Sequence, residues 1–398
     1  MKKLAVLIAI CLMLPISVSA TEEAYIYPYD YAWEEFWYNE AEQTATLTGD
    51  FKAKSAYLME ASTGKVLYSQ NEDDRLPIAS VTKIMSTILI MEALDNRKID
   101  LNEMVTISEN AASMGGSQVY LETNEQMSVH ELLKAVVIVS ANDATLALAE
   151  HIYGSEESFI QAMNERAEGL GMENTNFVNT NGLPAEGHYS SAEDVALMTR
   201  ELLKYPLTLE YSTIWMDTIR NGSFGLANTN KLIRFYKGAN GMKTGFTNEA
   251  MFCLSGTALR DGMQLIAVVL GADTSEERFG TVKKMLDFGF ANYMVVTPEK
   301  LSLEPVEIIK GVKETASIDY SPATILLEKG KDIDIKQTVH IEQTPQAPVL
   351  KDDIVGYVVY EKDGFEVARV PVSISEDVDK INYFIVLGRM IKNIFAVF

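Results

Sequence analysis

Apolar and polar positions in the first third of the chain change period, and each period predicts a different element. Between Ser55 and Tyr68 they alternate with a period of two, interrupted by Ser62-Thr63-Gly64-Lys65, which is typical of two strands joined by a turn. From Val81 to Ala93 apolar residues occupy more than one face of a helix, which indicates a buried helix. This region therefore predicts a hairpin followed by an internal helix.

Two further helical segments, 129–139 and 143–152, are separated by the polar break Ser140-Ala141-Asn142. The period then returns to two between Gly238 and Gly271. The elements expected there and beyond are a strand at 241–246, a hairpin of strands 251–259 and 263–270, and a helix at about 276–293. Helices placed between an early hairpin and a late antiparallel sheet favour an α+β fold, which we assign to residues 51–296.

A change of pattern at Thr297-Pro298 marks the start of a different segment. Residues 297–376 lose the helical period and show short apolar runs separated by turn residues, which predicts a small all-β domain of the sandwich type. Residues 377–398 regain a helical period, with a narrow polar wedge and a wide apolar arc. We expect an amphipathic helix, capped by Ser375-Glu376-Asp377, that lies in a membrane surface rather than spanning the membrane.

The N-terminus has the pattern of a secretory signal. Two lysines precede an apolar run from Leu4 to Ile16, and Val18-Ser19-Ala20 is a small-residue cleavage site. We expect residues 1–20 to be removed and the exported protein to act at the outer face of the cytoplasmic membrane. Residues 21–50 alternate aromatic and acidic side chains, a pattern that fits either a strand or an unstructured leader.

Acidic residues outnumber basic ones, and the net charge is −22 at pH 7. This charge argues against binding to nucleic acid and against electrostatic binding to an anionic surface. Cys253 is the one cysteine beyond the predicted signal, so no internal disulfide is expected, and its apolar neighbours predict a buried, inert thiol. The four histidines have no metal-binding spacing, and we expect neither a metal nor a cofactor.

A candidate nucleophile and a candidate base open the buried helix in Ser80-Val81-Thr82-Lys83. Serine at position i and lysine at i+3 share one helix face. Lysine becomes a useful base when desolvation and a nearby positive charge lower its pKa, and Lys243 could supply that charge. The pair is weak by itself, because it also fits a capped helix with a surface lysine.

Two more motifs follow in order: Ser140-x-Asn142 lies 60 residues after Ser80, and Lys243-Thr244-Gly245 lies about 100 residues further on. This trio characterises class A β-lactamases and penicillin-binding proteins. From about Ser55 onward the sequence resembles the low-molecular-mass penicillin-binding proteins, specifically the serine D-alanyl-D-alanine carboxypeptidases. The strings that carry the resemblance are Leu76-Pro77-Ile78-Ala79-Ser80-Val81-Thr82-Lys83-Ile84-Met85, Val139-Ser140-Ala141-Asn142-Asp143-Ala144, Asn176-Phe177-Val178-Asn179-Thr180-Asn181-Gly182-Leu183 and Met242-Lys243-Thr244-Gly245-Phe246-Thr247.

The resemblance implies a transpeptidase-like catalytic domain and a role for each motif residue. Ser80 would attack the carbonyl between the two terminal D-alanines of a peptidoglycan pentapeptide, or a β-lactam, and Lys83 would take its proton. Ser140 would relay protons, and Asn142 would hold the substrate amide and Lys83. The implied substrate-binding residues are Lys243 and Thr244 at the carboxylate, Gly245 beside the substrate, Phe246 with Ser80 in the oxyanion hole, and Arg278 as a carboxylate-attracting arginine.

The segment 187–200 resembles a family segment near the site and contains three more polar candidates. We interpret His188 as structural, and Asp194 with Arg200 as a buried helix-end pair rather than as catalytic groups.

Three other functions stay open. A class A β-lactamase needs a glutamate in Glu-x-x-x-Asn spacing, and Glu173 precedes Asn176 by one residue too few. A D,D-endopeptidase acting on peptide crosslinks uses the same motifs, although the C-terminal β domain and helix favour the carboxypeptidase. A non-catalytic muropeptide-binding protein would tolerate loss of the nucleophile or base, and here all three motifs are intact.

Overall fold

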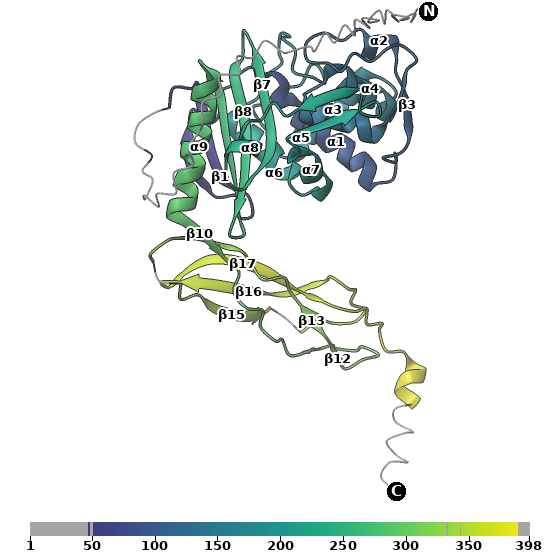
Figure 1. Ribbon diagram of the computed structural model, residues 1–398. Coiled ribbons are helices and arrows are strands. Elements are labelled where there is room, and N and C mark those ends of the chain that lie inside the picture. The colour runs from purple at the N-terminus through teal and green to yellow at the C-terminus, as the bar shows by residue number, and fades with distance from the viewer. Residues whose placement is uncertain (1–46, 48–50, 332, 343, 389–398) are drawn as a thin grey trace, which may run out of the picture. The chain divides into compact units, whose positions relative to one another are not determined.

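The structure is a computed structural model that describes residue 47 and residues 51–331, 333–342 and 344–388 (Figure 1). The predicted signal peptide at 1–20, nearly all of the segment 21–50 and residues 389–398 lie outside the described residues. The described elements form a mixed helix-and-sheet part and, after it along the chain, a part built of strands.

A five-stranded antiparallel sheet organises the first part. Its strands are β1 (Ser55–Glu60), β2 (Val66–Gln70), β7 (Ala239–Thr247), β8 (Met251–Arg260) and β9 (Met263–Ala272), in the order β2-β1-β9-β8-β7. The early and the late hairpin predicted from the sequence join into one sheet because β1 pairs with β9 along its whole length, from Ser55 opposite Leu270 to Glu60 opposite Leu265. Strand β7, which carries the Lys243 motif, lies at one edge.

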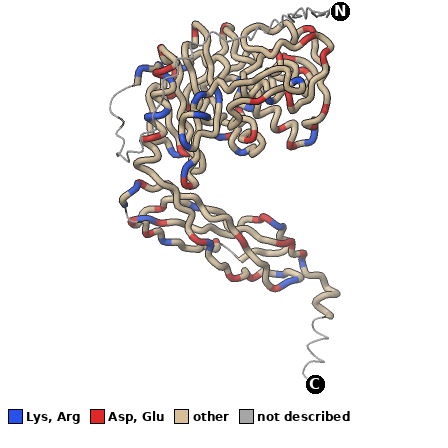
Figure 2. Tube along the Cα trace, viewed as in Figure 1, with Lys and Arg blue, Asp and Glu red and all other residues tan. Residues whose placement is uncertain are grey.

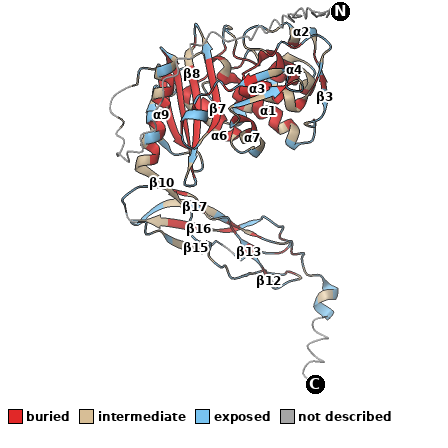
Figure 3. Cartoon of the chain, in the orientation of Figure 1, coloured by how far each residue is buried: buried red, intermediate tan, exposed pale blue. Residues whose placement is uncertain are grey.

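Both faces of this sheet are covered, as the buried strands in Figure 3 show. Along β9 the side chains alternate between two cores: Ile266 and Val268 belong to the core shared with the helices inserted between β2 and β7. Leu265 and Val269 belong to the core shared with α9 (Ser275–Asn292). Because successive side chains of a strand point to opposite faces, alternate residues of β9 pack into two different apolar layers.

Helices and short strands inserted between β2 and β7 pack mainly against the first of these faces. Their bounds are η1 (a 3₁₀ helix, Ala79–Thr82), α1 (Lys83–Asp95), β3 (Met104–Thr106), α2 (Glu109–Ala112), β4 (Gln126–Ser128), α3 (Val129–Ile138), α4 (Asn142–Tyr153), α5 (Glu156–Gly169), α6 (Ala192–Leu202), α7 (Pro206–Ser212), β5 (Met216–Ile219), β6 (Phe224–Ala227) and α8 (Leu232–Phe235). Helix α1 is buried on all sides from Lys83 to Met91, which confirms the prediction of an internal helix.

Serine hydroxyls define the start of several of these helices. Ser128, Ser155 and Ser191 precede α3, α5 and α6, and each side-chain oxygen accepts a hydrogen bond from the backbone N–H three residues later. Such a cap satisfies one of the N–H groups that a helix leaves unpaired at its N-terminus. The break predicted between two apolar helices is real, because α3 ends at Ile138 and α4 begins at Asn142.

The strands that follow α9 enclose their own apolar core. They are β10 (Tyr293–Val296), β11 (Val306–Glu307), β12 (Thr315–Ala316), β13 (Ile318–Asp319), β14 (Ile325–Glu328), β15 (Lys336–Ile341), β16 (Ile354–Lys362) and β17 (Phe365–Ile374). Four form the sheet β13-β17-β16-β15, while β10 pairs with β14 and β11 with β12. The turn between β16 and β17 is the predicted Asp363-Gly364, with positive φ at both residues, as a tight hairpin requires. An all-β domain was expected here, and the fold class is confirmed.

The predicted cap of the C-terminal helix is wrong. Asp377 accepts a hydrogen bond from the Lys351 N–H and Glu376 pairs with Lys313, so both side chains are engaged by the β domain. Val378 is buried in the β-domain core. Helical backbone begins at Tyr383, after Asn382, whose Oδ1 accepts from the Ile385 N–H at 3.0 Å. Core packing of the β domain thus extends several residues further than expected, and the amphipathic pattern of the predicted helix lies largely in residues 389–398, outside the described residues.

Acidic and basic residues are interspersed along the described chain (Figure 2). Within the described residues, no helix has the length and apolar character needed to cross a bilayer.

Candidate active site

The turn that carries Ser80 is a single 3₁₀ turn leading directly into α1. Side chains at i and i+3 of a 3₁₀ helix lie almost above one another. Ser80 and Lys83 have this spacing, and the Lys83 Nζ lies 3.1 Å from the Ser80 Oγ. Ala79, just before the serine, has a φ of 47°, a left-handed conformation that is uncommon for a residue with a side chain. The sequence motif therefore produces the predicted contact, on a backbone turn that the motif alone does not reveal.

Lys83 is completely buried, and three oxygens surround its amine. Besides Ser80, they are the Asn142 Oδ1 at 2.6 Å and the Asn181 carbonyl at 2.9 Å. Burial lowers the pKa of Lys83 well below its ordinary value, and the nearby charge of Lys243 lowers it further. Asp143 opposes this effect and is the smallest of the three influences.

Residues 140–142 connect α3 to α4 and place two polar side chains at the site. Ser140 has a φ of 65°, and its buried Oγ makes no hydrogen bond within the described part of the chain. A left-handed backbone at a non-glycine residue costs energy and is often found at functional sites. Asn142 is the first residue of α4, and its Nδ2 donates to the Gly115 carbonyl at 2.7 Å while its Oδ1 faces Lys83.

Strand β7 contributes a second buried lysine. The Lys243 Nζ donates to the Thr244 carbonyl at 2.9 Å, and the Thr244 hydroxyl bonds that of Thr229 at 2.7 Å. Burial, followed by the positive charge of Arg278, lowers the pKa of Lys243 to about 7. Lys83 and Lys243 line one small cavity in the protein interior. The charge of Arg278 thus acts on Lys243, and the charge of Lys243 acts in turn on Lys83 and favours its neutral form.

Gly245 is required by packing within the protein. A Cβ at this position would lie 2.6 Å from the Ile78 carbonyl oxygen and 3.1 Å from the Val81 backbone nitrogen. The strand therefore packs against the Ser80 turn so closely that a side chain at position 245 has no room. Gly245 was expected to lie beside the substrate, and this contact within the protein is a second reason for a glycine there.

Phe246 and Arg278 flank the outer end of β7. Phe246 is 42% exposed, and its ring packs on Phe252 with centroids 4.4 Å apart. The Arg278 guanidinium is buried between the rings of Phe252 and Phe279, and its Nη1 donates to the Gly245 and Cys253 carbonyls at 3.3 Å each. The structure thus brings Arg278 to the same strand as Lys243, although they are 35 positions apart in the sequence.

The segment 176–183, one of those that carry the family resemblance, makes direct contact with the site. Asn181 supplies the carbonyl that binds Lys83. Asn179 organises the turn, since its Oδ1 accepts from the N–H groups of Asn181 and Gly182. A Cβ on Gly182 would lie 1.8 Å from the Ala79 carbonyl oxygen, so no side chain fits there. Sequence reasoning missed the role of Asn181 because a backbone carbonyl has no residue-type signal.

His188 is structural, as expected. Its Nδ1 accepts a hydrogen bond from the Val178 N–H at 3.1 Å, so its Nε2 carries the proton and donates to the Thr82 hydroxyl at 2.8 Å. Burial, with the charge of Lys83, lowers the pKa of His188 to about 4. The imidazole therefore ties the segment 176–183 to the Ser80 turn in its neutral form.

Asp194 and Arg200 do not form the pair that was expected. They lie in the first and last turns of α6 and bind different partners. Asp194 accepts from the Thr175 hydroxyl and the Asn174 N–H, and Arg200 donates to the Ala61 and Ser62 carbonyls. Both residues nevertheless serve to join segments of the fold, in keeping with the non-catalytic interpretation.

Glu173 and Cys253 are the remaining candidates from the sequence. Glu173 is exposed and contacts Arg75 through its carbonyl, a surface position that gives no support to the β-lactamase alternative. Cys253 is fully buried on β8, and burial raises its pKa to about 11. The predicted burial is confirmed, and a buried thiol with a raised pKa is expected to react slowly.

Known proteins resemble the chain over most of its length. A family model described as D-alanyl-D-alanine carboxypeptidase matches residues 40–274, and one for the C-terminal domain of penicillin-binding protein 5 matches residues 300–380. D-alanyl-D-alanine carboxypeptidase DacF of Bacillus subtilis is 46% identical over 345 residues, covering 85% of this chain and 89% of the relative. These matches agree with the two folded parts described above.

Solved structures give the same result. Penicillin-binding protein 5 from Haemophilus influenzae superposes with a TM-score of 0.72 at 32% identity, covering 84% of this chain and all of that one. Penicillin-binding protein D2 from Listeria monocytogenes, in its ampicillin-bound form, has a TM-score of 0.57 at 34% identity and covers 62% of this chain and all of its own. The predicted enzyme class is confirmed, and the chain belongs to the D-alanyl-D-alanine carboxypeptidases of peptidase family S11.

Proposed function

We propose that this enzyme removes the terminal D-alanine from peptidoglycan pentapeptides through an acyl-enzyme on Ser80, with Lys83 as the base. The observation that carries the proposal is the arrangement of three oxygens around the Lys83 Nζ: Ser80 Oγ, Asn142 Oδ1 and the Asn181 carbonyl. A neutral amine has two N–H donors and one lone pair. When the two N–H groups bond Asn142 and Asn181, the lone pair faces the serine hydroxyl.

The lowered pKa of Lys83 supports the neutral amine that this role needs. Desolvation in the buried helix and repulsion from Lys243 both disfavour the ammonium form. The Ser80 hydroxyl can then transfer its proton to the Lys83 Nζ as its oxygen attacks the substrate carbonyl. The resulting ammonium has three N–H donors for the three oxygens, so the site also accommodates the charge that forms during the reaction.

The remaining steps follow from ordinary acyl-transfer chemistry. Attack by the Ser80 Oγ gives a tetrahedral intermediate whose oxyanion we assign to the backbone N–H groups of Ser80 and Phe246. The C–N bond then breaks and D-alanine leaves, its nitrogen taking the proton that Lys83 accepted from Ser80, relayed through Ser140, so that Lys83 is neutral again. Water, deprotonated by Lys83, finally attacks the ester carbonyl and releases the shortened peptide from Ser80.

We assign recognition of the substrate carboxylate to Lys243 and Thr244, with Arg278 adding positive charge. The support is the clustering of these residues on β7 and the N-terminal turn of α9 beside it. We also assign contact with the substrate amide to Asn142, whose side chain lies between Gly115 and Lys83. Buried cationic groups bind a carboxylate strongly because little water competes with them.

β-Lactams are the second class of ligand that we assign to Ser80. A β-lactam presents a strained amide next to a carboxylate, the same two groups that the site would recognise in D-Ala-D-Ala. Ampicillin is bound in the related Listeria structure, which supports the assignment.

The decisive experiment is mass spectrometry of a pentapeptide digested by the wild type and by Ser80→Ala. We expect the wild type alone to remove one alanine, and fluorescent penicillin to label the wild type alone. Hydrolysis by Ser80→Ala at the wild-type rate would refute the assigned nucleophile. Cleavage of a crosslinked muropeptide dimer in preference to the pentapeptide would instead favour an endopeptidase.

We also propose that the protein is exported and is held at the outer face of the cytoplasmic membrane by its C-terminal helix. Tyr383 and Phe384 are 72% and 80% exposed, and Val386 and Leu387 are exposed beside them. Apolar side chains gathered at the start of a helix with an amphipathic sequence fit insertion at a lipid surface. Because the whole chain is acidic, hydrophobic burial must provide the attachment.

A further inference from the structure

The loop between α2 and β4 contacts Asn142 through its backbone. The Asn142 Nδ2 donates to the Gly115 carbonyl, and the Asn142 N–H donates to the Ser117 carbonyl, both at 2.7 Å. A Cβ on Gly116 would lie 2.8 Å from the Asn142 Nδ2, so the loop backbone is packed against this amide. The position of the loop therefore fixes the orientation of the side chain whose Oδ1 binds Lys83.

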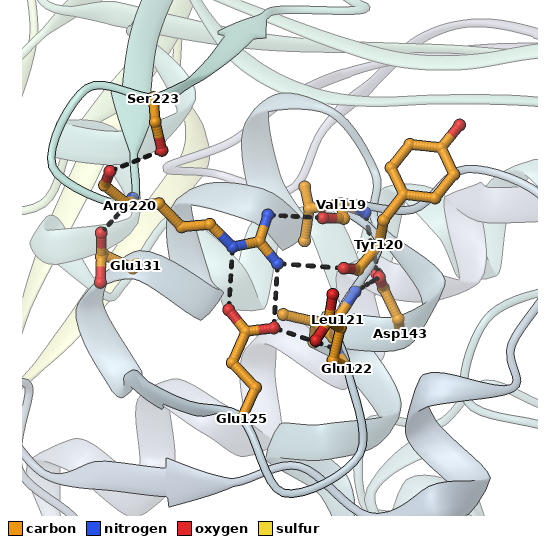
Figure 4. A network of polar contacts seen from close by, with 9 residues as sticks. All are labelled: Val119, Tyr120, Leu121, Glu122, Glu125, Glu131, Asp143, Arg220 and Ser223. Carbon is orange, nitrogen blue, oxygen red and sulfur yellow. Dashed lines mark hydrogen bonds and ion pairs between the residues drawn. The ribbon is translucent and has the colours of Figure 1, made fainter.

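The far end of the same loop is held from two sides (Figure 4). On one side, the Asp143 carboxylate accepts from the Val119 N–H at 3.0 Å and from the Leu121 N–H at 3.1 Å. On the other side, Arg220 donates from its Nη1 to the Val119 carbonyl at 2.8 Å and from its Nη2 to the Tyr120 carbonyl at 3.1 Å. Tyr120, between Val119 and Leu121, has a φ of 55°, a left-handed backbone conformation that is uncommon for a non-glycine residue. Asp143 and Arg220 together enforce this backbone.

Arg220 is itself firmly oriented. Its Nε and Nη2 donate to the two oxygens of Glu125 at 2.8 and 3.0 Å, and its backbone N–H donates to Glu131 at 2.7 Å. The side chain is half-buried in the turn between β5 and β6 (Figure 4). A planar guanidinium can bond one carboxylate and two carbonyls at once, whereas a lysine ammonium cannot reproduce that geometry.

We propose that Arg220 is a positioning residue for acylation. Through residues 115–121 and Asn142 it keeps the Lys83 amine within hydrogen-bond distance of the Ser80 hydroxyl. Each link is a contact of the described residues, from Arg220 to the Val119 and Tyr120 carbonyls, along the loop to Asn142, and from there to Lys83 at 2.6 Å. Arg220 touches neither the nucleophile nor the base. The inference rests on the roles assigned above to Ser80, Lys83 and Asn142.

A double-mutant cycle on the rate of acylation by fluorescent penicillin tests the proposal. Arg220→Ala should slow acylation by about 10- to 100-fold, the range expected when a catalytic group is misplaced by a remote change. Arg220→Lys should recover only part of the rate. In an Asn142→Ala background, Arg220→Ala should have an effect of less than about twofold, because residues that act through one another are not additive.

Arg166 provides a matched control. It is also half-buried and pairs with two carboxylates, Glu92 and Glu201, but it lies on α5 and contacts no residue of the 115–121 loop among the described interactions. Arg166→Ala should lower the melting temperature without changing the acylation rate. Glu125→Gln removes the charge that orients the Arg220 guanidinium but leaves the bonds from Arg220 to the Val119 and Tyr120 carbonyls in place. If Arg220→Ala does not fold, this milder variant replaces it in the same cycle.

The outcomes separate the possible failures. A wild type that is not acylated would refute the proposed function and not this inference. An Arg220→Ala enzyme that is acylated at the wild-type rate would overturn the inference. Purely additive effects with Asn142→Ala, or equal slowing by Arg166→Ala, would also overturn it.

Discussion

The α-carbon of Gly245 faces the carbonyl of Ile78 so closely that a Cβ would lie 2.6 Å from the oxygen. Because Ile78 precedes the Ser80 turn, this contact fixes the distance between the strand that carries Lys243 and the helix that carries Lys83. The two buried lysines depend on that distance, since the charge of one lowers the pKa of the other.

Gly245→Ala should therefore damage both stability and acylation. Forcing a methyl group against backbone atoms costs about 1–3 kcal/mol of unfolding free energy, and the displaced turn should slow acylation at least about tenfold. Gly280→Ala in α9 is the control, because nothing lies within 4 Å of a Cβ there. It should leave acylation unchanged and stabilise the helix slightly. Equal behaviour of the two variants would contradict the packing role of Gly245.

Lys83 and Lys243 should respond differently to replacement by arginine. Arginine keeps the positive charge but does not release its proton, so Lys83→Arg should lower the acylation rate by about 10²- to 10⁴-fold, the usual contribution of a general base. Lys243→Arg keeps the charge assigned to carboxylate binding and should lose less. Stopped-flow measurements with fluorescent penicillin, alongside melting temperatures, make the comparison. A Lys83→Arg enzyme that retains rapid acylation would exclude Lys83 as the base.

The pH profile of kcat/KM should be bell-shaped. Lys83 acts as a base when neutral, so activity rises with pH through its lowered pKa. Lys243 binds carboxylate when charged, so activity falls as pH rises past its pKa of about 7. In Arg278→Gln the neighbouring positive charge is gone, the pKa of Lys243 rises, and the alkaline limb should move to higher pH. An alkaline limb that stays in place in this variant would show that Lys243 does not set it.

His188 should make the fold sensitive to acid. The imidazole has a pKa of about 4 in the folded protein, against about 6.5 when unfolded, so between these values the unfolded chain binds the extra proton. Stability should be unaffected by this group above about pH 6.5 and should fall by about 3 kcal/mol as the pH drops to about 4.

Urea unfolding of the wild type and His188→Gln at several pH values measures this contribution. The variant should lose stability less steeply over the same pH range. His340→Gln, at an exposed position on β15, is the control and should keep the wild-type slope. If the free energy of unfolding depends on pH equally in the wild type and in His188→Gln, His188 does not cause the sensitivity to acid.

The structure shows where a C-terminal deletion should start in a test of membrane attachment. Truncation at 378 would remove Val378 from the β-domain core, so the deletion should start at Asn382. The truncated enzyme should remain folded and active but should no longer float with phospholipid vesicles. Replacing Phe384 and Leu387 by aspartate in the full chain should have the same effect. Continued flotation of both variants would place the attachment elsewhere.

The sequence predicted the elements whose burial follows a simple period. Strands β7, β8 and β9, helix α1 and the break before α4 all lie within a few residues of their expected positions. The sequence also identified Ser80, Lys83, Asn142 and Lys243 as candidates by their side-chain chemistry, and the structure brings Lys83 into contact with Ser80 and Asn142 and lines one cavity with Lys83 and Lys243. The pairings β1–β9, β9–β8 and β8–β7 bring Lys243 into the same sheet as the early hairpin, and the buried helix α1 carries Lys83. The strands and the helix each have a hydrophobic period that can be recognised in the sequence.

What could not be predicted depends on backbone geometry or on context. The Asn181 carbonyl binds Lys83, yet every residue type offers a carbonyl. The left-handed φ values of Ala79 and Ser140 occur at residues that do not favour them. Arg220 lies in an exposed-looking turn between two short strands, and its partners are revealed only by the fold. The capping error at 375–377 arose because acidic residues that bind the connections between strands have the same sequence pattern as a helix cap.

The buried state of Cys253 has a practical consequence for studying motion in this enzyme. It is the one cysteine among the described residues and is fully buried, so maleimide reagents should not react with it in the folded protein. A cysteine introduced at an exposed position such as Phe365, 75% exposed on β17, would then be the accessible thiol of the folded part. A dye or spin label could be attached there, in a preparation lacking the predicted signal, without altering the native cysteine.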